Sequence, residues 1–130
     1  MIKTLRVVMI VYGIIGILLG LILVIFPDQM TEWFNAPVLN DYEKFLSASI
    51  GLANIAAGIF IFLAARDPIK NISWVKFAIV WALFWAVTVL YGLVRGYVDF
   101  SQEGSALIIN IIFAALFFIF YPWRVKESSA

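Results

Sequence analysis

The residues able to do chemistry in this chain are few, and those inside its long apolar stretches are uncharged. The candidates among them have hydroxyl or amide side chains that can form hydrogen bonds: Tyr12, Ser47, Ser49, Asn54, Thr88, Tyr91, Ser105 and Asn110. Because an unpaired polar group is costly in hydrocarbon, such residues either join helices or line a pocket. Both interpretations stay open. In the first, Asn54 and Asn110 would bridge to each other or to Thr88 and fix how the helices pack.

Aromatic residues accompany this polar set. Trp81, Trp85 and Thr88 fall on one side of a helix, with Arg95 at its end. Both tryptophans lie away from the headgroup level that tryptophan prefers. They could pack against glycine faces, form a wall for a flat apolar ligand such as a quinone or a lipid chain, or face lipid. Arg95 could attract an anionic headgroup or substrate, or it could pair with Asp99.

The composition argues against most kinds of catalysis. The chain has no cysteine and no histidine, which removes thiol redox chemistry, disulfides, His-ligated haem and imidazole acid–base catalysis. The apolar stretches hold no carboxylate for proton-driven exchange. A net charge of +1 without a basic stripe argues against nucleic-acid binding. We therefore expect no catalytic, cofactor or metal site and no enzymatic activity, a quinone being the one cofactor with any support.

Four stretches without Asp, Glu, Lys or Arg must position these residues, at 7–26, 45–65, 77–94 and 104–123. At about 1.5 Å per helical residue, each can cross a hydrocarbon core of about 30 Å. The chain of 130 residues is 65% hydrophobic and 13% charged. It is predicted to be an all-α integral membrane protein, an antiparallel four-transmembrane-helix bundle forming one domain over 1–130. The predicted spans are near 5–26, 45–65, 72–94 and 104–123.

Two further features concern how these spans are joined. The connection 27–44 is long enough for a short interfacial helix near 28–35, acting as a lid or a float, with Met30, Trp33 and Phe34 on one face. The alternative is a plain loop that crosses between the helix ends. Small residues recur on one side of each of the first two spans, which predicts that these two helices pack closely. They are Gly13, Gly16 and Gly20 in the first span, and Ser47, Gly51, Asn54 and Gly58 in the second. Spacing does not decide whether they meet within one chain or between two copies.

The basic residues predict an orientation. Seven lie near the termini and the second connection, and two lie in the first and third connections. The seven are Lys3, Arg6, Arg66, Lys70, Lys76, Arg124 and Lys126, and the two are Lys44 and Arg95. The positive-inside rule therefore places both termini in the cytoplasm and the protein in the cytoplasmic membrane.

Short motifs carry a resemblance to a family. The second span ends in FLAARDPIK, with Arg66-Asp67-Pro68, the third leads into RGYVDF, and FPD follows the first. The chain resembles the BphX-like group of small bacterial membrane proteins, and the wider DoxX-like four-helix proteins are similar in layout. The resemblance implies four spans and no assigned catalytic residue. Some DoxX-like members are linked to quinone-reducing membrane complexes.

The expected function is that of a non-catalytic accessory or binding protein in the lipid bilayer. Its ligand or partner would be lipid, an apolar small molecule, a second copy of the chain or a partner membrane subunit. One alternative is a subunit of a quinone-linked membrane oxidoreductase. Another is a transport component for uncharged solutes.

Overall fold

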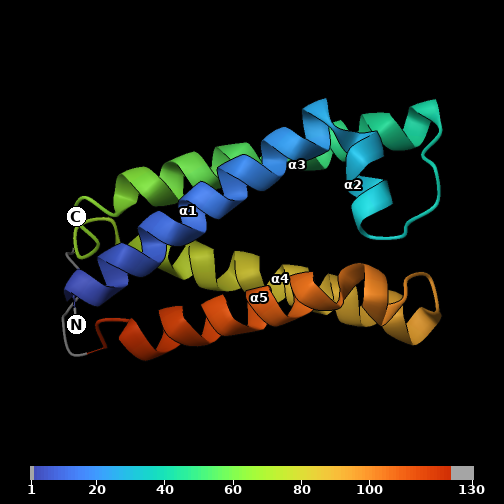
Figure 1. Ribbon diagram of the computed structural model, residues 1–130. Coiled ribbons are helices and arrows are strands. Elements are labelled where there is room, and N and C mark those ends of the chain that lie inside the picture. Colours follow the sequence, from blue (N-terminus) through green and yellow to red (C-terminus); the bar gives the residue numbers. More distant parts are fainter. Residues whose placement is uncertain (1, 124–130) are drawn as a thin grey trace.

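The computed structural model describes residues 2–123, which form five α-helices (Figure 1). These are α1 (Ile2–Ile25), α2 (Pro27–Trp33), α3 (Asp41–Ala64), α4 (Ile72–Arg95) and α5 (Phe100–Phe120). All except α2 are long and apolar enough to cross a membrane. Helices suit this environment because each backbone polar group finds its partner within the segment. The predicted all-α bundle of four spanning helices is confirmed, and the chain is a multi-pass membrane protein.

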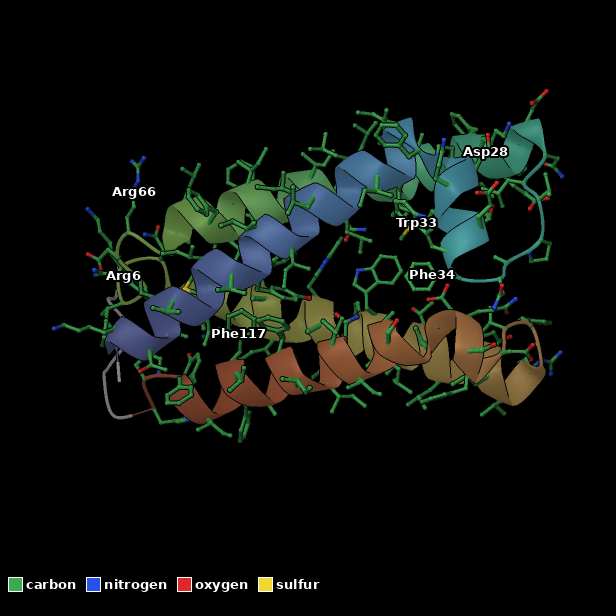
Figure 2. The ribbon with its side chains drawn as sticks, in the orientation of Figure 1. Arg6, Asp28, Trp33, Phe34, Arg66 and Phe117 are labelled. Carbon is green, nitrogen blue, oxygen red and sulfur yellow. The ribbon has the colours of Figure 1, made fainter. Side chains whose placement is uncertain are left out.

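The four long helices form two antiparallel pairs (Figure 1). One pair is α1 with α3, and the other is α4 with α5. Figure 1 shows the pairs close together where α1 begins and α5 ends, and further apart toward α2. We call these the terminal end and the α2 end of the bundle. Arg6 and Arg66 lie at the terminal end and Asp28 at the α2 end, as Figure 2 shows.

Glycines bring α1 and α3 into backbone contact. A β-carbon on Gly58 would lie 2.6 Å from the carbonyl oxygen of Gly13, and one on Gly51 would lie 2.6 Å from that of Gly20. No side chain fits at such distances, so small residues are what permits this approach. The Ser47 hydroxyl adds a hydrogen bond of 2.9 Å to the Leu23 carbonyl oxygen. The predicted close pairing of these two helices is confirmed, and it is formed within one chain.

A dense apolar core joins the two pairs at the terminal end. Its largest members are at most 1% exposed: Leu5, Met9, Ile61, Val75 and Phe117. The fully buried alanines Ala78 and Ala82 of α4 belong to the same cluster. The space between the pairs is therefore filled with side chains in this half of the bundle.

Local signals set the connections at the α2 end. Asn40 begins α3, because its side-chain oxygen accepts a hydrogen bond from the Glu43 backbone N–H at 2.8 Å. Gly96 ends α4 in the left-handed conformation, with φ of 74°. The Gln102 side chain accepts from the backbone N–H of Asp99 at 2.9 Å and so begins α5. The caps at Asn40 and Asp99 begin α3 and α5 before their apolar stretches start.

Candidate functional site: an interhelical cavity

A cavity of about 730 Å³ lies between the two helix pairs in the α2 half of the bundle. Residues from all five helices line it. Tyr12 and Ile61 belong both to this lining and to the core at the terminal end, so the cavity ends where that core begins. Its inner end is thus closed. We call the opposite end, which α2 and the residues after it line, the mouth of the cavity.

One wall of the cavity is aromatic. Trp81 and Trp85 both line it, their rings edge to face with centroids 6.2 Å apart. Phe77 stacks behind Trp81 at 5.4 Å. The glycine faces of α1 and α3 pack against each other, so the expectation that the tryptophans pack against them is wrong. Trp81 also packs against the apolar core at the terminal end, so this wall is partly a packing surface and partly cavity lining.

Asn54 belongs to α3 and lines the cavity from the α1–α3 pair, opposite the aromatic wall on α4. It is 6% exposed, and its side chain makes no hydrogen bond with any residue from 2 to 123. No completely enclosed side-chain nitrogen or oxygen in that range lacks a partner, so the Asn54 amide must reach the open space of the cavity. Its hydrogen-bonding groups are therefore available to a bound molecule.

The predicted bridges from Asn54 to Asn110 or Thr88 are wrong. The Thr88 hydroxyl instead donates to the Phe84 carbonyl oxygen of its own helix at 2.8 Å. The Asn110 side-chain oxygen accepts a hydrogen bond from the Tyr12 hydroxyl at 3.2 Å. Asn110 donates in turn to the Ala106 carbonyl at 2.8 Å. A side-chain hydrogen bond between the two helix pairs is thus formed by Tyr12 and Asn110, at the floor of the cavity.

Substituting Tyr12 with phenylalanine should lower the free energy of unfolding by about 1 kcal/mol, the usual size of an interhelical hydrogen bond in a membrane protein. The ring would stay packed on Phe113 and Phe117, whose centroids lie 4.8 and 5.3 Å from its own. Unfolding in a denaturing detergent, followed by circular dichroism, measures the loss. Tyr91→Phe is the control, since Tyr91 is 59% exposed. An equal loss from Tyr12→Phe in an Asn110→Ala background would contradict this role of the hydrogen bond.

Helix α2 and the turn after it cover the cavity mouth. Met30, Thr31 and Phe34 line the cavity, whereas Trp33 is 63% exposed and does not. Figure 2 shows Phe34 between α2 and the α4–α5 pair. The Gln102 amide donates to the Asn35 carbonyl oxygen at 3.0 Å and ties this turn to α5. The sequence suggested that this helix is either a lid or a float, and α2 has the position of a lid.

Two carboxylates in the lining were not expected there. Glu43 and Glu103 both face the cavity, although the sequence places them in connections. The spacing of these acids from polar residues on the same helix could have indicated that they face the cavity. Glu43, Ser47 and Asn54 are four and seven residues apart, and Glu103 and Asn110 are seven apart, so each set shares a helix face.

Arg95 and Tyr91 occupy the periphery of the site. Arg95 is exposed and lies outside the lining, and its guanidinium carbon is 5.7 Å from the Tyr97 ring centroid. The ion pair with Asp99 that the sequence suggested is not formed within residues 2–123. Tyr91 lines the cavity and meets Tyr97 edge to face, with centroids 6.0 Å apart.

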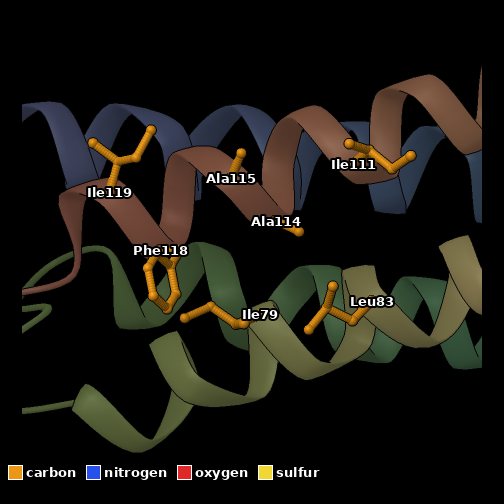
Figure 3. A pocket seen from close by; sticks show the side chains of 7 residues that line it. All are labelled: Ile79, Leu83, Ile111, Ala114, Ala115, Phe118 and Ile119. Carbon is orange, nitrogen blue, oxygen red and sulfur yellow. The ribbon is translucent and has the colours of Figure 1, made fainter.

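A smaller hollow of about 320 Å³ lies between α4 and α5 (Figure 3). Ile79 and Leu83 of α4 lie across it from Ala114 and Phe118 of α5, and every residue that lines it is apolar. Acyl chains of the bilayer suit such a surface without further recognition. It offers no group that could orient a specific ligand.

No protein-family model, curated protein or solved structure matches this chain. The resemblance to BphX-like proteins therefore rests on the short motifs alone, and the cavity is the guide to function.

Proposed function

We propose that this protein is a non-catalytic membrane protein that binds an apolar small molecule or a lipid in the interhelical cavity. The observation that carries the proposal is the cavity itself. Its volume of about 730 Å³ falls within the range of about 300–1,000 Å³ that is usual for ligand sites. Apolar and aromatic walls with a few fixed polar groups are also typical of such sites.

The chemistry of the deep polar groups supports binding rather than catalysis. Tyr12, Asn54 and Asn110 are a phenol and two amides, which orient a ligand through hydrogen bonds. A side-chain amide does not ionise near neutral pH and so is no general acid or base, and the Tyr12 hydroxyl is already engaged with Asn110. These groups suit recognition of a ligand's polar atoms.

The distribution of charge supports a cytoplasmic-membrane protein with its termini inside. Among the described residues, five basic side chains lie at the terminal end: Lys3, Arg6, Arg66, Lys70 and Lys76. Lys44 and Arg95 lie at the α2 end. Arg124 and Lys126, which also enter the sequence argument, lie outside the described residues. In this orientation the cavity mouth opens toward the outer face of the membrane.

A quinone-binding subunit of a membrane oxidoreductase is the second candidate. The position of Trp81 and Trp85 in one wall favours it, because a flat ring can stack on an indole. The Asn54 amide could donate a hydrogen bond to a quinone carbonyl. Transport of a solute is less favoured, because the core around Leu5, Met9 and Phe117 fills the route beyond the cavity.

Asn54→Leu tests the binding proposal. We expect the variant to lose about tenfold in affinity for a ligand that uses the amide. Its unfolding free energy should change by less than about 0.5 kcal/mol, since no hydrogen bond to residues 2–123 is lost. Native mass spectrometry of the detergent-purified protein measures the co-purified ligand, and thermal melting measures stability.

Ser49→Leu is the matched control, because Ser49 lies on the same helix, is exposed and lies outside the cavity lining. It should keep the wild-type ligand occupancy. A loss of stability in Asn54→Leu with unchanged ligand occupancy would instead show that Asn54 holds helices together. That result would remove the main polar group from the proposed site.

A further inference from the structure

We infer that the ligand of the interhelical cavity is a lipophilic organic cation. Its positive charge would lie near Glu43 and Glu103 at the mouth, and its apolar body would lie along Trp81 and Trp85. The inference rests on the proposed function, since it names the chemical class of the ligand for the same site. Three observations carry it: the sign of the charges in the lining, the aromatic wall and the unpartnered Asn54.

The charged residues in the lining are all acidic. Glu43 and Glu103 are the two charged residues that line the cavity within the described chain, and neither takes part in a salt bridge there. Because no basic side chain neutralises them, these carboxylates favour a positive ligand and disfavour a negative one. Glu103 is also half-buried, so water screens its charge less than that of an exposed group.

The surrounding charges reinforce this preference. Six acids lie at the α2 end, against the two bases Lys44 and Arg95. The six are Asp28, Glu32, Asp41, Glu43, Asp99 and Glu103. Lys44 is paired with Asp28 at 3.5 Å, and Arg95 lies over the Tyr97 ring. The region around the mouth is therefore electronegative, and an approaching cation would be attracted to it.

The aromatic lining indicates which kind of cation fits. Trp81, Trp85, Phe34, Tyr91 and Tyr97 contribute rings to the cavity surface. Ring faces attract weakly hydrated organic cations, such as quaternary ammonium groups. A strongly hydrated metal ion would gain little from such walls, whereas an apolar cation gains from contact with them. The surface thus selects charge and hydrophobicity together.

Asn54 is the independent sign that a ligand enters beyond the mouth. Its side chain is more than nine-tenths buried, lines the cavity and makes no hydrogen bond to residues 2–123. Its amide oxygen can accept a hydrogen bond from the ligand, and its amide nitrogen can donate one to a polar atom of the ligand. A molecule that extends from the two carboxylates to Asn54 would balance their negative charge and supply the hydrogen-bond partner that the Asn54 amide lacks.

Calorimetric titration of the full-length protein in an uncharged detergent tests the inference. The probes are tetraphenylphosphonium, the similarly shaped anion tetraphenylborate and the neutral decylubiquinone. We expect saturable binding of tetraphenylphosphonium, weakened about fivefold by Glu43→Gln and by Glu103→Gln. Glu32→Gln is the matched control, because Glu32 is an exposed acid on α2 outside the lining, and it should bind as the wild type does.

The outcomes separate this inference from the proposed function. Equal binding of tetraphenylborate and tetraphenylphosphonium, or tetraphenylphosphonium binding that both glutamine variants retain, would overturn the preference for a cation and leave the binding function standing. Binding of decylubiquinone alone would also overturn the preference for a cation and leave the binding function standing, and it would favour the quinone candidate. Failure of all three probes to bind would count against both. Circular dichroism melting verifies that the glutamine variants are folded.

Discussion

Alanine at position 20 should lower the free energy of unfolding of the bundle by about 2–3 kcal/mol, which is typical of overpacking in a filled interior. The added methyl group would overlap the carbonyl oxygen of Gly51, and it would lie 2.6 Å from Cγ1 of Ile55. A backbone carbonyl in a helix cannot rotate away, so α1 and α3 would have to separate. Unfolding in a denaturing detergent, followed by circular dichroism, measures the effect.

Gly16→Ala provides the control on the same helix. Its β-carbon would lie 3.4 Å from the Asn54 carbonyl oxygen, close to an ordinary contact distance. We expect a change of less than about 0.5 kcal/mol, because alanine also favours the helix over glycine. Similar losses at positions 16 and 20 would show that the close contact between Gly20 and Gly51 does not set the stability of this helix pair.

Truncating Phe117 to alanine should cost about 3 kcal/mol, because it leaves a void that its neighbours only partly fill. Its side chain is fully buried and packs edge to face on Tyr12, with centroids 5.3 Å apart. Figure 2 shows it between the two helix pairs at the terminal end. Since the pairs meet through this core, the variant should also weaken their association. Detergent-induced unfolding gives the first effect, and cross-linking between α1 and α5 gives the second.

Phe118→Ala removes the same atoms from the adjacent position. The Phe118 side chain is 57% exposed on the surface of the bundle, where lipid replaces the lost contacts. We expect a loss below about 1 kcal/mol there, in line with substitutions away from a packed core. If both variants lost the same stability, the core at the terminal end would not be what joins the pairs.

The positions of the four spans and the close packing of the first two spans could be predicted from the sequence, because each depends on a strong local constraint. Hydrocarbon excludes charge, so charge-free stretches mark the helices that cross it. Close helix contact in lipid needs small residues, so the glycine spacing identified the α1–α3 contact. Both constraints act on residue types that are visible in a single sequence.

The polar contacts could not be predicted in the same way. The depth of Asn54 and Asn110 along their helices is readable from the sequence, but the rotation of one helix against another is not. The glycines bring α1 and α3 together and leave a cavity between this pair and the other. Asn54 therefore faces open space, and Asn110 meets Tyr12 instead.

The two carboxylates were missed for a related reason. Charge-free stretches set the predicted span limits at 45 and 104, which places Glu43 and Glu103 in connections. The capping interactions at Asn40 and Asp99 begin α3 and α5 earlier, and each acid falls in a first helical turn. Capping residues just before an apolar stretch are thus a better guide to where a spanning helix begins than the last charged residue.

Each helix pair consists of spans that follow one another along the chain, so each is a hairpin that could insert into the bilayer as a unit. The glycine contacts of the first hairpin need nothing from the second. The cavity, in contrast, belongs to neither hairpin and exists only once they have docked. A ligand held there would stabilise the docked arrangement through mass action. Occupancy of the cavity would then report that synthesis and assembly of the whole chain are complete.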